Sequence, residues 1–183
     1  NGAEYESGKT VGTPPVNIDT GRIRRLRDAL VESGRLEATE DLQGDRPASR
    51  GRLAALDRVA PFVETMYLMM MVDGERDEPE QEAIRGAMRV LTQGLLDDTG
   101  LGELIQRIEQ QVRDQGVEAR LQAIGSRICA DRQDRETAFS LAAAMALADD
   151  KVATEESLLV ASIAEWFGVS GRRCREILQE FES

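Results

Sequence analysis

The chain has 183 residues, a formal net charge of -11 and a pI near 4.6. This acidic balance argues against a nucleic-acid-binding protein, because such proteins usually carry a basic excess. The sequence contains no histidine, which excludes Ser-His-Asp and Cys-His catalytic groups and any zinc site with histidine ligands.

Residues 1–50 are predicted to form an arm that precedes the main domain. Residues 1–17 are rich in Gly, Pro, Ser and Thr and lack periodicity, which is typical of a flexible segment. Residues 18–34 predict one short Arg-rich helix that ends at Gly34 and carries an apolar stripe of Ile23, Leu26 and Leu30. Its arginines would face solvent, the acidic bundle of this chain, an acidic partner or an anionic lipid surface. Residues 35–50 are interpreted as a linker.

The main domain is predicted to cover residues 51–183 and to be all-α. Apolar residues recur there at spacings of three and four, and no segment alternates as a strand would. Pro61, near the middle of the first helix, would kink or divide that helix. The predicted helices cover residues 51–72, 79–95, 101–114, 117–131, 135–148, 154–167 and 171–181.

The cysteines and the apolar runs describe an ordinary globular chain. Cys129 and Cys174 lie 45 residues apart and form no CxxC motif, so we expect two buried, reduced thiols. No apolar run approaches the ~20 residues that a membrane-spanning helix needs. The sequence therefore predicts neither a disulfide framework nor a transmembrane segment.

A helical hairpin occurs twice in the main domain, at an offset of 76 residues. With Asp149 aligned beneath Asp73, Glu156 falls beneath Glu80. The apolar residues of the flanking helices are in phase: Val63, Met66, Met69 and Val72 align with Phe139, Ala142, Met145 and Ala148. Each copy thus has an apolar helix, an Asp at its end, an acidic loop, a Glu in the next first turn and a second apolar helix. Two such hairpins would bury their apolar faces against each other.

This duplicated D-[GD]-x5-E spacing in an acidic, all-helical chain resembles the TerB family of tellurite resistance proteins, whose domain also occurs in DjlA-like co-chaperones. The resemblance covers residues 51–183. It implies a seven-helix bundle with two acidic clusters, proposed in the family to bind metal ions, on the cytoplasmic side of a stress-response system. The family's usual glycine after the Asp is present as Gly74 but is replaced by Asp150 in the second copy.

The residues themselves leave two interpretations of the acidic loops open. In the first, Asp73, Glu80, Asp149 and Glu156 bind a divalent cation such as Ca²⁺, which prefers 6–8 oxygen ligands at about 2.3–2.6 Å. Either each loop holds a weak site with its own Asp and Glu, or the two copies pool all four carboxylates around one cation. Additional oxygen ligands would come from Glu75, Asp77, Glu78, Asp150 and Glu155. A complete EF-hand is excluded, because apolar residues replace its first acidic ligands. In the second interpretation, the acids only cap helices and shape turns.

Each of the two interpretations predicts a different function. The first predicts a non-enzymatic module that binds divalent metal ions within a stress-response or membrane-associated complex, in the cytoplasm or at the inner membrane surface. The second predicts a metal-independent scaffold for protein interactions. A catalytic di-iron bundle is not expected, because such sites use Glu-x-x-His pairs and this chain has no histidine.

Overall fold

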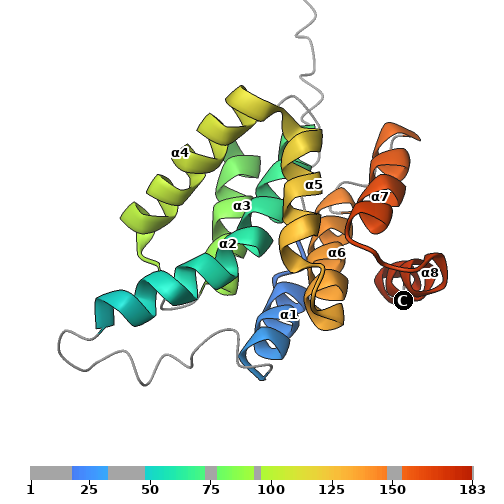
Figure 1. The fold of residues 1–183 in the computed structure, drawn as a ribbon, viewed down its shortest axis with the longest axis horizontal. Coiled ribbons are helices and arrows are strands. Elements are labelled where there is room, and N and C mark those ends of the chain that lie inside the picture. The colour runs from blue at the N-terminus through green and yellow to red at the C-terminus, as the bar shows by residue number, and fades with distance from the viewer. Residues whose placement is uncertain (1–17, 33–47, 73–77, 93–95, 148–153, 183) are drawn as a thin grey trace, which may run out of the picture.

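The structure is a computed structural model that describes residues 18–32, 48–72, 78–92, 96–147 and 154–182 (Figure 1). This part of the chain contains α-helices and no strand, which confirms the all-α prediction. The elements are α1 (Thr20–Glu32), α2 (Ala48–Val72), α3 (Glu78–Leu91), α4 (Asp98–Gln115), α5 (Val117–Ile128), α6 (Arg132–Ala146), α7 (Thr154–Trp166) and α8 (Gly171–Glu182).

The two predicted hairpins, α2–α3 and α6–α7, form the framework of the bundle. Their long first helices, α2 and α6, pack against each other and each contribute more core residues than any other described helix, and each also packs against the second helix of its own hairpin. Between the hairpins in sequence, α4 packs on α2 and α5, while α5 packs on α2 and α7 (Figure 1). The seven helices predicted for the main domain are therefore α2 to α8.

The middle of α2 is enclosed on every side, because residues 61–69 are all buried. Among them, Met66 has no exposed surface and Met69 is 6% exposed, as expected for core methionines. Pro61 lies within the helix and is also buried, but α2 runs on through it without a break. Division of the helix at Pro61 was one of the two predicted outcomes, and the structure instead has one continuous element.

Small residues in α5 and α6 allow neighbouring helices to approach closely. In α6, four alanines in the segment 142–146 are buried. In α5, Gly125 faces the end of α7 so closely that an added Cβ would lie 2.3 Å from the carbonyl oxygen of Trp166. The α5–α7 contact therefore depends on a residue that has no side chain at this position.

The predicted arm helix packs on the bundle as α1. It contacts α3 and α6, and Ile23 and Leu30 from its predicted apolar stripe are fully buried in the common core. On another side, Arg22 stacks over the ring of Phe181 at 3.5 Å from the centroid and donates to the carbonyl oxygen of Glu180 on α8. The domain boundary proposed after residue 50 stays a prediction.

The expectation of two buried cysteines is wrong. Cys129 follows the end of α5 and is exposed, and its thiol donates to the carbonyl oxygen of Ser126. Cys174, in α8, is half-buried, and partial burial raises the pKa of its thiol despite the opposing charge of Arg175. Both thiols are free. Cys174 packs only partly against the core, and Cys129 lies past the end of α5. The apolar character of cysteine therefore did not indicate how far each side chain is buried.

Candidate functional site

The two hairpins place their second helices in the same register. α2 ends at Val72 and α3 begins at Glu78, while α6 ends at Ala146 and α7 begins at Thr154. The starts of α3 and α7 are separated by the offset of 76 residues that the sequence alignment predicted. Glu80 and Glu156 are consequently the third residues of their helices, in the first turn, where the helix dipole favours a carboxylate.

The four predicted metal ligands lie largely outside the described residues. Asp73 and Asp149 fall in the segments 73–77 and 148–153, and the side chains of Glu80 and Glu156 are also outside the described set. The structure therefore places the backbone of the two glutamates on α3 and α7. The assignment of these residues as ligands of a shared cation stays a prediction.

Most of the acidic residues predicted to supply additional oxygen ligands also lie outside the described residues. Glu75, Asp77 and Asp150 fall in the same two undescribed segments, and Glu155 is described only as part of the α7 backbone. Glu78, the first residue of α3, is exposed. Within the ranges that the structure describes, no group of three or more Asp, Glu, Cys or His side chains is arranged to hold a metal ion.

A small polar cavity adjoins the first hairpin between α2, α3 and α4. Its volume is about 100 Å³, and its lining includes Tyr67, Gln81, Arg85 and Glu109. The hydroxyl of Tyr67 donates to Glu109 Oε1 over 2.5 Å, which is the short distance typical of a hydrogen bond to a carboxylate. The sequence does not indicate this contact, because its two partners lie 42 residues apart on different helices.

One ion pair is largely buried between α2 and α5. Glu64 on α2 is 4% exposed and accepts two hydrogen bonds from Arg120 on α5. The distances are 2.7 Å from Nε to Oε1 and 3.0 Å from Nη2 to Oε2, so the pair is bidentate. Arg120 also donates to Gln115 Oε1 at 3.3 Å. A charged residue within the otherwise apolar α2 stripe was the available signal for this pair.

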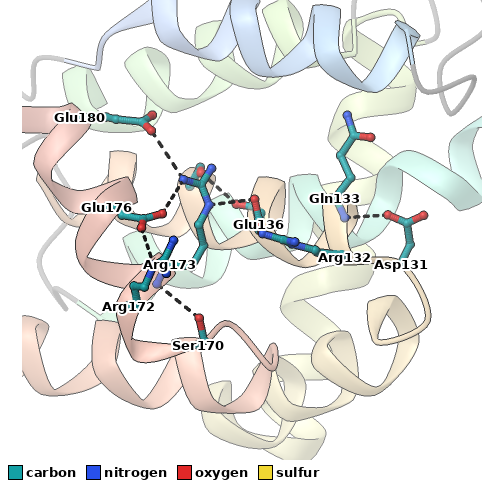
Figure 2. A network of polar contacts seen from close by, with 10 residues as sticks. Asp131, Arg132, Gln133, Glu136, Ser170, Arg172, Arg173, Glu176 and Glu180 are labelled. Atoms are coloured by element: carbon teal, nitrogen blue, oxygen red, sulfur yellow. Dashed lines mark hydrogen bonds and ion pairs between the residues drawn. The ribbon is translucent and has the colours of Figure 1, made fainter.

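A second network of charges joins α6 to α8, as Figure 2 shows. Glu136 accepts hydrogen bonds from Arg132 at 2.7 Å and from Arg173 at 3.0 Å. Arg173 also bonds Glu176 at 3.2 Å and approaches Glu180 at 3.9 Å, while Arg172 bonds Glu176 at 2.9 Å. The network ties the start of α6 to the first three turns of α8.

Hydrogen bonds in this network perturb the carboxyl and guanidinium groups. Burial by itself raises the pKa of Glu136, but the hydrogen bonds and charges of Arg132 and Arg173 outweigh burial and hold that pKa below its ordinary value. The pKa of Glu176 is also lowered, chiefly by the hydrogen bond from Arg172. The same contacts, with Glu136 foremost, raise the pKa of Arg173. All of these groups are therefore charged at neutral pH.

Comparison with known proteins gives one finding on the family. The family model described as tellurite resistance protein TerB matches residues 58–179, about two thirds of the chain. The match begins within α2, and it includes the rest of the first hairpin, the whole second hairpin and both acidic loops. No curated protein and no solved structure matches the chain significantly. In the described ranges, no helix is both long enough and apolar enough to cross a membrane.

Proposed function

The chain belongs to the TerB family of tellurite resistance proteins, and from this membership we propose that it is a non-enzymatic module that binds divalent metal ions. The ligands are Asp73 and Glu80 in the first hairpin and Asp149 and Glu156 in the second. We further propose that the module works in the cytoplasm with other proteins of a stress-response complex, and that this complex lies at the inner membrane surface.

One observation carries the metal proposal: the hairpins repeat in register. The second helices start 76 residues apart, and each has a glutamate at its third position. Each aspartate directly follows or closely follows the end of a first helix, where the helix dipole disfavours a negative charge. A carboxylate kept twice at an unfavourable position supports a compensating positive charge beside it.

The chemistry of the proposed ligands suits a hard cation such as Ca²⁺. Carboxylate oxygens are the ligands that Ca²⁺ and Mg²⁺ prefer. One Asp and one Glu supply at most four oxygens, fewer than the 6–8 that Ca²⁺ takes. Backbone carbonyls, water or the other acids of the loops would complete the coordination. This ligand count supports weak, exchangeable binding.

Thermal unfolding of the full chain tests the proposal. In metal-free buffer supplemented with millimolar Ca²⁺, Mg²⁺, Mn²⁺ or Zn²⁺, at least one ion should raise Tm, because a ligand that binds only the native state stabilises it. At a metal concentration of 100 times Kd the gain is about 2.7 kcal/mol. The double substitution Asp73→Ala and Asp149→Ala should abolish this response.

A matched control removes two acids outside the loops. Asp28 on α1 and Asp114 on α4 are both exposed, and their joint replacement by Ala changes the net charge by the same amount. The control variant should respond to metal as the unsubstituted protein does. An unchanged Tm of the unsubstituted protein in every metal would refute the proposal.

A second function, a metal-independent scaffold for protein interactions, is favoured by the apolar residues beside the loops. Val72 at the end of α2 is 39% exposed, Leu147 after α6 is 36% exposed, and Leu158 on α7 is 65% exposed. Exposed apolar side chains mark a partner surface where they form a contiguous patch, so this function requires the three to act as one surface. For this function, the substitutions at Asp73 and Asp149 should leave stability and partner binding unchanged in all metals.

A further inference from the structure

A cavity of about 290 Å³ lies where α6 begins and α7 turns into α8, and it is rich in arginine. Three guanidinium groups and one carboxylate line it, together with the turn between the helices. The lining residues are Arg132, Arg135, Glu136, Gly168, Val169, Ser170 and Arg173. The chain as a whole has a net charge of -11, so this cavity is a local concentration of positive charge on an acidic protein. We propose that the cavity binds the phosphate group of a small molecule.

Arg135 is the residue whose bonding is incomplete. Its Nε is fully buried and has no hydrogen-bond partner, and no ion pair of its side chain is found within the described ranges. A buried guanidinium donor without an acceptor is costly, and without an ion pair Arg135 keeps a positive charge that an anion in the cavity would balance. The neighbouring arginines differ, because both already bond Glu136.

The turn between α7 and α8 leaves room for the side chain of Arg135. Gly168 has φ of +67°, and a Cβ added there would lie 3.2 Å from Arg135 Nη1 and 3.7 Å from its Cδ. The side chain of Arg135 therefore occupies the space beside Gly168 that a larger residue would fill with its own side chain. This packing holds the guanidinium at the wall of the cavity, on a turn that favours glycine.

Other lining groups add suitable donors. Arg132 uses Nε for Glu136 and is 77% exposed, so its remaining N–H groups are accessible. The hydroxyl of Ser170 accepts the backbone N–H of Arg173 at 3.3 Å and keeps its own proton to donate (Figure 2). Directly after Ser170, α8 begins with its positive dipole end at the cavity.

This combination of groups matches a phosphate. Planar guanidinium groups donate in pairs to phosphate oxygens, and a helix start adds backbone N–H donors to an anion. Glu136 holds Arg132 and Arg173 in place, and Glu176 and Glu180 also pair with Arg173, so Arg135 is the lining arginine that has no carboxylate partner in the described part of the chain. The volume is near the lower end of small-molecule pockets, about 300 Å³, which suits inorganic phosphate or a small phosphate monoester.

The site is separate from the proposed metal ligands. Glu136 precedes the end of α6 at Ala146 by ten residues, which corresponds to about 15 Å along the helix axis, and the second acidic loop follows that end. Phosphate binding and metal binding can therefore be measured independently, provided that the buffer is freed of metal by a chelating resin and contains no soluble chelator.

Isothermal titration calorimetry of the full chain tests the proposal, with inorganic phosphate and glycerol phosphate as probes at constant ionic strength. The unsubstituted protein should show saturable binding, and Arg135→Gln should weaken it at least tenfold. The matched control is Arg113→Gln, which removes an exposed arginine from α4 and should leave the affinity unchanged. Tighter binding of glycerol phosphate would identify a phosphate monoester as the ligand, and equal or weaker binding would identify free phosphate.

Absence of saturable binding by the unsubstituted protein, or equal affinity in Arg135→Gln, would overturn the proposal. If Arg135→Gln does not fold, as judged by circular dichroism, the exposed Arg132→Gln decides instead. That variant should weaken phosphate binding severalfold without affecting the fold, and an unchanged affinity would count against the site.

Discussion

Replacing Arg120 by Met is expected to destabilise the protein by about 3–5 kcal/mol, because it leaves the carboxylate of Glu64 buried without a partner. Glu64 is 4% exposed and has both oxygens bonded to Arg120, at 2.7 and 3.0 Å, so the substitution removes both of these donors from a carboxylate that has little contact with solvent. For a chain of this length, the loss corresponds to a fall in Tm of roughly 6–20 °C.

The double substitution Glu64→Leu and Arg120→Met separates burial of charge from packing. It removes both charges and retains apolar side chains of similar length, so its free energy of unfolding should lie within about 1–2 kcal/mol of the unsubstituted protein. Urea unfolding followed by circular dichroism gives all three free energies.

A solvent-exposed ion pair provides the control for these two variants. Arg172 and Glu176 also form an arginine–glutamate pair, but their side chains are 85% and 40% exposed. Arg172→Met should therefore change stability by less than about 1 kcal/mol. If Arg120→Met costs no more than Arg172→Met, the pair between α2 and α5 is not buried as described and the reasoning is wrong.

Three further substitutions test packing and charge, each by urea unfolding. Gly125→Ala should destabilise by about 1–3 kcal/mol or more, because its Cβ would overlap the carbonyl oxygen of Trp166 at 2.3 Å. Gly102→Ala, within α4 and with no atom within 4 Å of the added Cβ, should instead stabilise by about 0.5–1 kcal/mol. Glu136→Gln should lower stability at neutral pH. Since the pKa of Glu136 is lowered by folding, its contribution is present above the ordinary value of 4.5 and is lost as the pH falls through the folded pKa, so the difference between the two proteins should shrink there.

The same measurements can contradict these expectations. A neutral Gly125→Ala would mean that α5 and α7 separate without cost, and a destabilising Gly102→Ala would mean that α4 has a neighbour at that face. A stability difference for Glu136→Gln that stays constant from about pH 7 to about pH 3 would show that the carboxylate is not held by its arginines.

Periodicity predicted the positions of the helices well, although it extended α3 and α5 past their ends at Leu91 and Ile128. Its late starts have one physical cause. The prediction began three helices three residues late, at 51, 101 and 135, where α2 starts at Ala48, α4 at Asp98 and α6 at Arg132. The first turn of each helix is largely polar, so the apolar stripe starts after the helix does. In α4 and α6 the missed signals were the caps: Asp97 accepts from the N–H of Gly100, and Asp131 accepts from two N–H groups.

The candidate site was predictable only where it repeats. An internal duplication compares the chain with itself, and it located the second helices in register and the glutamates in their first turns. The side-chain contacts between helices are not repeated in the second hairpin, so the duplication does not reveal them. The position that corresponds to Glu64 in the second hairpin is Ser140, and Glu136 meets Arg173 across 37 residues. One sequence cannot indicate which of many charged residues meet in space.

Pro61 shows how such a contact resolves an ambiguity that the sequence left open. Proline has no N–H, so the carbonyl oxygen of Asp57, four residues earlier, loses its helical partner. Arg127 on α5 supplies the missing donor: its Nη2 lies 2.7 Å from that oxygen and 2.9 Å from Asp57 Oδ1. One guanidinium from a neighbouring helix thus compensates the backbone and pairs with the side chain of the same residue. The proline indicates a weak point in α2, but only the position of α5 explains why the helix continues through it.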